Sequence, residues 1–422
     1  MVRRPRVPPR AARRPDHPLE YNILVTATLC LLAAGAVMVY SASSARTLLE
    51  GRGAGTDLLV RYLAFGAVGL GVMFVLARHG VALVQRFTRP LLVVSFACLV
   101  AVKIPGLGVE VNGATRWLGA GPLQFQPSEL TKLALVLYAA SLLAERPQRV
   151  QTLWGAISPL LLVAGACALL VVSQPDLGTA LVMCFCMLAM LVAAGVPRRH
   201  LAVLCGLGTV AVTLFAFSAD YRRERLMSFL DPWAQAGDAG FQMVQGQIAV
   251  GSGGMFGLGP GQSVQKVFYL PEAHTDFILA VIGEELGVVG ICGLLFLYGL
   301  IAYAGLRAAK AARTFHTQLL AAGVTSLILC QALLNVFAVL GMVPLTGVPL
   351  PFISSGSSSL LTLMAGVGLL LNIASKPHTR LRAVPTAKPG GSARDDDTGP
   401  DRRRRHGGAR GARAGGGRRA AG

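Results

Sequence analysis

Long apolar stretches separated by short polar ones make up most of the chain. Ten of them approach the roughly 20 consecutive apolar residues that a helix needs to cross the hydrocarbon core of a bilayer. They lie at residues 21–42, 58–77, 84–104, 129–145, 153–173, 177–196, 201–218, 277–305, 317–343 and 357–375. The pattern predicts an all-α polytopic membrane protein with about ten transmembrane helices.

The basic residues predict the orientation of these helices, because positively charged connections stay on the cytoplasmic side. The basic connections are residues 1–17, 78–86, 146–149, 197–200, 307–316 and the C-terminal tail, and all fall on one side of the membrane. Both termini are therefore predicted to be cytoplasmic. The other side receives residues 43–57, 105–128, 174–176, 219–276 and 344–356, so 219–276 is a large extracytoplasmic loop between helices seven and eight.

Composition supports a membrane protein and argues against a nucleic-acid-binding one. The 422 residues are 53% hydrophobic and only 14% charged, which is too apolar for a soluble globular chain. Of the net charge of +19, 14 charges lie in residues 1–17 and 376–422, and such tails are solvated or touch anionic lipid. We expect disordered cytoplasmic tails at 1–19 and 377–422 and a membrane domain at 20–376.

The sequence also argues against several other features. The eight cysteines all lie in apolar stretches, so we expect neither a disulfide framework nor a zinc site. The glycine-rich segment 251–261 lacks a Gly-Lys-Ser/Thr sequence and a preceding strand, so a nucleotide site is not expected there. The first apolar stretch is long enough to span and lacks a small-residue cleavage pattern, so no cleaved signal peptide is expected.

Ionisable residues concentrate around the start of the eighth predicted helix. Each costs roughly 2.5–3.5 kcal/mol at the centre of a membrane helix, so such residues usually mark function. Asp276, at the mouth of the helix, is a candidate general base or, alternatively, a helix cap. Structural pairing inside the bundle is an equal alternative for Glu284 and Glu285. The complete group is Lys266, Glu272, His274, Asp276, Glu284 and Glu285.

The predicted outward connections carry further polar groups. Ser128 can cap the helix that follows, and Glu129 and Lys132 share one face of it, where they can form an ion pair. Arg116 and Lys132 lie on the predicted outer side, against the positive-inside bias, so the alternative to a purely structural pair is an anion-binding site. Asp176 suits an N-cap, and Gly178 would allow close helix packing.

The segment 341–359 contains three prolines followed by serines, which indicates irregular backbone near membrane depth. Such backbone is tolerated only where it lines a cavity or is buried in protein. Asn335, in the preceding span, adds an inward-facing polar group.

Together these motifs resemble the FtsW/RodA/SpoVE proteins, the SEDS group, over about residues 20–376. The resemblance rests on Asn112-Gly-Ala-Thr-Arg116-Trp, Gln126-Pro-Ser-Glu129-x-x-Lys132, Gln174-Pro-Asp176-x-Gly-Thr, Leu270-Pro-Glu-Ala-His-Thr-Asp276-Phe, Gly283-Glu-Glu-Leu-Gly287 and Pro351-Phe-Ile-Ser354. It implies a peptidoglycan glycosyltransferase that polymerises lipid II at the outer face of the bacterial cytoplasmic membrane. Val39–Ser44 favours the FtsW branch, whereas 345–351 is equally similar to RodA, so division and elongation both stay open.

The resemblance also implies roles for single residues. Asp276 corresponds to the catalytic aspartate, which would deprotonate the 4-hydroxyl of the acceptor sugar. Arg116 and Lys132, with a divalent cation (Mg²⁺ or Mn²⁺) as an option, would stabilise the departing pyrophosphate. The candidate substrate contacts are Arg116, Glu129, Lys132, Lys266, Glu272, His274, Ser354 and Ser358. Structural polar roles inside the membrane are expected for Asn112, Asp176, Glu284, Glu285 and Asn335.

The chain departs from the family at one turn, where Ser354-Ser-Gly-Ser-Ser358 replaces Ser-Tyr-Gly-Gly-Ser. The implied partners are lipid II, a nascent glycan on undecaprenyl pyrophosphate, a class B penicillin-binding protein and other divisome membrane proteins. Two other classes use the same features. A lipid II flippase would use the carboxylates as a proton relay, and a non-catalytic scaffold would recruit division proteins through the tails.

Overall fold

The computed structural model describes residues 18–49, 55–111, 113–120, 123–145, 147–148, 152, 158–218, 220–237, 240–270 and 273–375. All of them belong to one compact unit, Met1–His378. The predicted tails lie outside the described residues, apart from Pro18 and Leu19, and so do Asn112 and Glu272.

The described chain is mainly helical. The helices are α1 (Leu19–Leu49), α2 (Asp57–Ala101), α3 (Pro127–Glu145), α4 (Ser158–Val172), α5 (Leu177–Ala193), α6 (Arg198–Phe217), α7 (Asp220–Leu230), α8 (Phe241–Ser252), α9 (Gln265–Phe268), α10 (Ile278–Lys310), α11 (Phe315–Val339) and α12 (Ser357–Ala374). Among the described residues, seven helices are long and apolar enough to cross a membrane, namely α1, α2, α3, α6, α10, α11 and α12. Two shorter apolar helices, α4 and α5, accompany them. The predicted polytopic α-helical membrane fold is confirmed.

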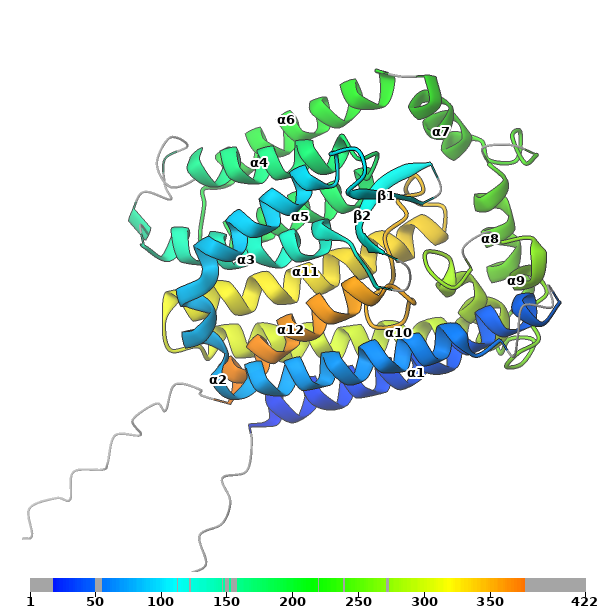
Figure 1. Ribbon diagram of the computed structural model, residues 1–422, viewed down its shortest axis with the longest axis horizontal. Coiled ribbons are helices and arrows are strands. Elements are labelled where there is room, and N and C mark those ends of the chain that lie inside the picture. The colour runs from blue at the N-terminus through cyan, green and yellow to red at the C-terminus, as the bar shows by residue number, and fades with distance from the viewer. Residues whose placement is uncertain are drawn as a thin grey trace, which may run out of the picture. The chain divides into compact units, whose positions relative to one another are not determined.

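Helix α2 contains two of the predicted spans in one element. Its 45 residues correspond to about 68 Å at 1.5 Å per residue, more than twice the ~30 Å hydrocarbon core. Figure 1 shows that α2 changes direction along its length, and its first part runs beside α12. The prediction of separate helices at 58–77 and 84–104 is therefore wrong in detail. The helix continues through the basic residues 78–86 and through Pro90, which lies inside it.

A small antiparallel sheet precedes α3 and was not predicted. Its strands, in the order β1-β2-β3, are β1 (Gly108–Val111), β2 (Ala114–Ala120) and β3 (Leu123–Phe125). Val109 pairs with Trp117, and Leu118 pairs with Phe125. Strands of this length in a glycine-containing loop carry too few residues for an alternating pattern to be read from sequence. The sheet contacts α3 and α12, and therefore borders the polar end of the bundle.

The centre of the bundle is formed by α3, α11 and α12. In their most apolar windows 72%, 78% and 89% of the residues are buried, whereas none is buried in α6. Figure 1 shows α11 and α12 lying between α3 on one side and α1 and α10 on the other. Helices α7, α8 and α9 lie at the end where α1 finishes, while α1 begins and α12 ends at the opposite end (Figure 1).

Helix α10 is broken at Gly287, whose φ of 65° and ψ of −163° are open essentially only to glycine. Segment 254–259 supplies hydrogen bonds to both sides of the break. The N–H groups beyond the break donate to that segment, and the carbonyls before it accept from it. The four bonds are Val288 to Gly254 (3.0 Å), Val289 to Met255 (3.2 Å), Leu258 to Glu284 (2.9 Å) and Gly259 to Glu285 (3.0 Å). The segment thus satisfies backbone groups that a helical turn would otherwise pair.

Candidate active site at the start of helix α10

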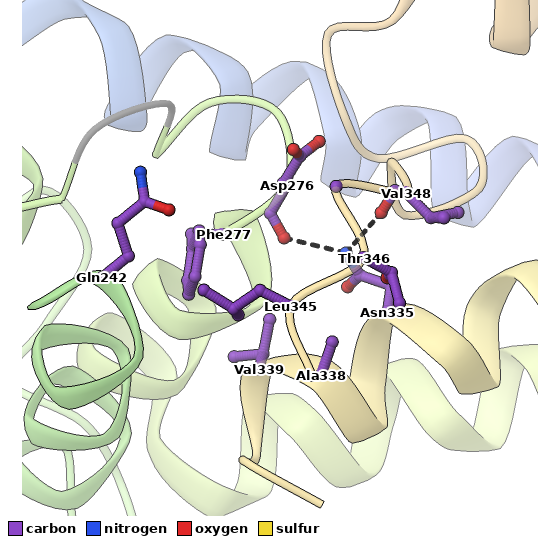
Figure 2. Close-up of a pocket in the computed structure, with 10 residues that line it drawn as sticks. Gln242, Asp276, Phe277, Asn335, Ala338, Val339, Leu345, Thr346 and Val348 are labelled. Atoms are coloured by element: carbon purple, nitrogen blue, oxygen red, sulfur yellow. Dashed lines mark hydrogen bonds between the residues drawn. The ribbon is translucent and has the colours of Figure 1, made fainter. Parts of the chain in front are cut away.

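Asp276 lies two residues before α10 and is half-buried. The N-cap residue of α10 is Phe277, so Asp276 is not the helix cap considered from sequence. Its neighbours enclose a cavity of about 50 Å³, formed by the mouth of α10, α8, the end of α11 and the segment after α11 (Figure 2). The lining residues are Gln242, Asp276, Phe277, Asn335, Ala338, Val339, Leu345, Thr346, Gly347 and Val348.

The backbone that carries Asp276 is held at three consecutive carbonyls. Asn335 Nδ2 of α11 donates to the carbonyl of Asp276 at 2.8 Å, as Figure 2 shows. The hydroxyl of Ser354 donates to the carbonyl of Thr275 at 2.5 Å, and the N–H of Ser355 donates to that of His274 at 3.2 Å. The chain leading into Asp276 is thereby fixed from two other elements, α11 and the segment before α12.

Gly347 brings the backbone of the segment after α11 close to the Asp276 carboxylate. Its φ is 65°, and a Cβ placed on it would lie 3.3 Å from Asp276 Oδ2. Both the conformation and the approach therefore favour glycine at this position.

Two buried polar atoms in the cavity wall have no hydrogen-bond partner among the described residues. They are Thr346 Oγ1 and Asn335 Oδ1. Buried polar atoms without partners cost free energy, so such atoms in a cavity wall suit a ligand or a water molecule. The cavity of about 50 Å³ is large enough to hold water.

A second polar cluster lies one helical turn along α11 from Asn335. Lys132 Nζ donates to Glu129 Oε1 at 2.9 Å and to Gln331 Oε1 at 2.7 Å, and both charged side chains are 1% exposed. The predicted Glu129–Lys132 pair is confirmed. Gln331 Nε2 donates to the carbonyl of Pro349 and to Ser359 Oγ, both at 3.0 Å. One face of α11 thus holds the segment after α11 at both Val348 and Pro349.

The predicted cap at Ser128 is wrong. Helix α3 begins at Pro127, and Ser128 Oγ has no hydrogen-bond partner among the described residues. A proline in the first helical position is already preorganised for the helix and lacks the N–H that a cap would satisfy.

Arg116 and Asp176 both make hydrogen bonds at the turn between α4 and α5. Arg116 Nε donates to the carbonyl of Gln174 at 2.9 Å, and its Nη2 donates to that of Pro175. Asp176 caps α5 as predicted, since its Oδ1 accepts from the N–H of Thr179 at 3.0 Å. Gly178 packs directly against the carbonyl of Thr346, which lies in the segment after α11 and not in a neighbouring helix.

Gln126 joins this turn to the start of α12. Its side-chain amide donates to Asp176 Oδ2 at 3.3 Å, and its backbone N–H donates to Ser358 Oγ at 3.0 Å. Ser358 is buried and faces the chain that enters α3.

Lys266 and the two glutamates form a third cluster. Lys266 Nζ lies 2.6 Å from Glu285 Oε1 and donates to Ser41 Oγ at 2.9 Å and to the carbonyl of Gly261 at 2.8 Å. Glu284 accepts from Ser263 Oγ at 2.5 Å and from the N–H of Val264 at 2.9 Å. Glu285 is thus paired inside the protein, as the structural alternative considered from sequence has it. Lys266 is buried with its ammonium group surrounded by protein oxygens, so contact with a substrate remains a prediction.

Sequence reasoning missed several residues of these clusters. Gln331 lies four residues before Asn335 in an apolar span, so the two share a helix face, and that spacing could have identified it. Gly347 and Thr346 belong to the proline-rich segment, whose course could not be read from sequence.

The site has a limited set of metal ligands. Among the described residues there is no group of three or more His, Cys, Asp or Glu side chains that could hold a metal ion. The oxygens around Asp276 are of the kind that Mg²⁺ prefers, and Mg²⁺ is commonly bound by one or two carboxylates together with substrate phosphates. The divalent cation therefore remains a proposal that depends on bound substrate.

These features define a class: a multi-pass α-helical membrane protein with a half-buried aspartate and buried charge clusters at one end of its bundle. Residues 22–379 match the FtsW/RodA/SpoVE family, described as cell cycle proteins. The chain belongs to this family.

Relatives and solved structures are consistent with membership of this family. Stage V sporulation protein E of Bacillus subtilis is 38% identical, over 83% of this chain and 96% of its own. A probable peptidoglycan glycosyltransferase FtsW of Thioalkalivibrio sulfidiphilus is 41% identical, over 83% of this chain and 88% of its own. A chain from a peptidoglycan synthase complex, in a structure concerned with polymerization and crosslinking, superposes with a TM-score of 0.70 and 31% identity, covering 86% of this chain and 98% of that one. A RodA crystal structure from Thermus thermophilus superposes with a TM-score of 0.62 and 31% identity, covering 84% of this chain and 96% of that one.

Proposed function

We propose that the protein is a peptidoglycan glycosyltransferase that polymerises lipid II into glycan strands, with Asp276 as its catalytic residue. The observation that carries the proposal is the placement of Asp276, a half-buried carboxylate at a cavity whose supporting backbone is held at three consecutive carbonyls. The names of the curated relatives support the same reaction.

The proposed reaction is a single displacement at the anomeric carbon of the donor. Asp276 accepts the proton of the acceptor 4-hydroxyl while that oxygen forms the new glycosidic bond. The bond from the anomeric carbon to the donor pyrophosphate breaks, and its electron pair leaves with the lipid pyrophosphate. A positioned base of this kind contributes about 10²–10⁴ in rate. An α-linked donor gives a β-linked product, so one carboxylate is sufficient.

The departing pyrophosphate needs positive charge. Arg116 and Lys132 are the proposed cations, but each already donates hydrogen bonds within the protein, to the 174–175 turn and to Glu129 and Gln331 respectively. Direct contact with pyrophosphate therefore requires that some of these bonds open when substrate binds. A divalent cation held by Asp276 and the phosphates would add charge neutralisation, and no step above depends on it.

The proposed location is the bacterial cytoplasmic membrane, with both termini cytoplasmic and Asp276 at the outer face. The support is the charge of the residues at the two ends of α10. Arg307, near the end farthest from Asp276, lies 3.1 Å from Glu20 at the start of α1, and the basic stretch of α2 reaches the start of α11 through Gln85 and His316 at 2.9 Å. This basic end is the one that the positive-inside rule assigns to the cytoplasm.

The proposed partner is a class B penicillin-binding protein that crosslinks the strands. The structural similarity to a chain of a peptidoglycan synthase complex supports a partner of this kind. The sequence contains neither a Ser-x-Asn nor a Lys-Thr-Gly motif, so it lacks the set that, together with Ser-x-x-Lys, is used for crosslinking.

Purified protein supplied with lipid II, with and without its cognate penicillin-binding protein, tests the function. We expect glycan strands when the partner is present. Movement of lipid II across protein-containing liposomes with no glycan formed would instead identify a flippase. Absence of both activities would favour a scaffold.

A further inference from the structure

The turn beneath Asp276 contains a strained residue. Phe352 has a φ of 63°, a left-handed conformation that is a genuine outlier for a bulky side chain, and it is 2% exposed. Conformations of this kind persist where the surrounding structure holds them.

Two buried tyrosines hold the two peptide groups that flank Phe352. Tyr298 Oη of α10 donates to the carbonyl of Pro351 at 2.6 Å. Tyr62 Oη of α2 donates to the carbonyl of Phe352 and lies 3.2 Å from the carbonyl of Leu32 in α1. The peptide before Phe352 and the peptide after it are thus each fixed by a phenolic hydroxyl from a different helix.

The same turn carries the donors that hold the chain at Asp276. Ser354 and Ser355, two and three residues after Phe352, hydrogen-bond to the carbonyls of Thr275 and His274. The Ser354 hydroxyl also accepts from the N–H of Leu350 at 2.8 Å, which closes the turn. A change in the backbone at Phe352 is therefore transmitted to Asp276 through two hydrogen bonds.

We propose that Tyr298 and Tyr62 are positioning residues for Asp276. Their hydroxyls keep the 350–355 turn in its strained form, and that turn sets the place of the carboxylate. The inference rests on the proposed function, since it assigns Asp276 the reacting carboxylate. Neither tyrosine lines the cavity at Asp276.

Phenylalanine substitutions isolate the hydroxyls. Both tyrosines are buried, at 3% and 4% exposure, so Tyr298→Phe and Tyr62→Phe keep the packed ring and remove only the donor. Tyr303→Phe is a matched control, because Tyr303 is on α10 as well, is 47% exposed, and bonds to Arg307 in the same helix.

Kinetics with lipid II and the penicillin-binding protein are the first readout. We expect kcat to fall roughly tenfold or more in each buried variant, since misplacing a reacting group by about 1 Å can cost 10²-fold, while KM stays within about twofold. Tyr303→Phe should keep wild-type values. Wild-type kcat in both buried variants, or an equal loss in the control, overturns the inference.

Hydrogen exchange of the 350–355 amides is a second readout that needs no activity. Losing one buried hydrogen bond should speed exchange at Ser354 and Ser355 roughly tenfold in the buried variants and leave it unchanged in Tyr303→Phe. Unchanged exchange in both buried variants overturns the inference whatever the activity. A wild type that makes no glycan contradicts the proposed function, and exchange then decides separately whether the tyrosines hold the turn.

Discussion

Asn335 binds the carbonyl of Asp276 with one side-chain N–H, at 2.8 Å, and uses the same amide group to bind the carbonyl of Val348, also at 2.8 Å. A single residue of α11 therefore connects the start of α10 to the segment that lies across the cavity. The two carbonyls are some seventy residues apart in the chain, so the Asn335 amide is a bridge between segments that are not neighbours in sequence.

Removing this bridge should reduce both turnover and stability. Asn335→Leu keeps a similar volume and leaves two carbonyls without their donor, each at about 1–3 kcal/mol if it stays buried and unpaired. We expect kcat to fall about tenfold to a hundredfold in the polymerisation assay. Thr325→Val is the control, since the Thr325 hydroxyl bonds to Ala321 within the same helix. Equal activity of the two variants would contradict the bridge.

Substituting Gly347 should impair the reaction specifically. Gly347→Ala places a methyl group 3.3 Å from the Asp276 carboxylate at a φ of 65°. Gly195→Ala imposes a similar backbone cost at a φ of 80°, and its Cβ meets no described atom within 4 Å. Both should lose about 1–2 kcal/mol of stability, measured by thermal unfolding in detergent. Only Gly347→Ala should lose most of its glycan synthesis, and comparable activity in the two would refute the crowding argument.

Variants of the Glu129–Lys132 pair distinguish a structural role of Lys132 from contact with the substrate. Lys132→Met alone leaves a buried carboxylate without its ion-pair partner and should destabilise the protein by about 3–5 kcal/mol. Adding Glu129→Gln removes the isolated charge, so the double variant should regain most of its thermal stability. If Lys132 also neutralises pyrophosphate, the double variant folds yet stays inactive. Full glycan synthesis by the double variant would restrict Lys132 to a structural role.

The Lys266–Glu285 pair should matter for stability because it is buried. Glu285→Gln leaves the Lys266 ammonium without its carboxylate, and we expect a loss of about 3–5 kcal/mol in the free energy of unfolding. The surface pair Arg89–Glu145, with side chains 81% and 54% exposed and 3.7 Å apart, provides the comparison. Glu145→Gln should cost less than about 1 kcal/mol. Similar melting temperatures for the two variants would argue that the buried pair does not stabilise the protein more than the surface pair does.

Local spacing explains what could be predicted from sequence. Glu129 and Lys132 are three residues apart on one helix, so their ion pair was readable, and Asp176 stands directly before the helix that it caps. Asp276 stood out because a carboxylate at the mouth of an apolar span is costly. The general membrane fold followed from span length, although α2 joined two spans into one helix.

What could not be predicted depends on contacts between distant parts of the chain. Lys132 and Gln331 are 199 residues apart, and Tyr62 and Phe352 are 290 apart. Tyr62 and Tyr298 look like ordinary aromatic residues of apolar spans until the 350–355 turn is placed beside them. The positive φ of Phe352 has no signal in a residue type that normally avoids it.

The central claim is that Asp276 is the reacting carboxylate. Its most direct test compares Asp276→Asn with Asp231→Asn, an exposed aspartate in the same predicted loop, by the rate of glycan formation from lipid II with the penicillin-binding protein present. We expect Asp276→Asn to fold with wild-type thermal stability to within about 1 kcal/mol and to lose at least about 10²-fold in rate. Asp231→Asn should match the wild type. A folded Asp276→Asn protein that still forms glycan at near wild-type rate would contradict the account.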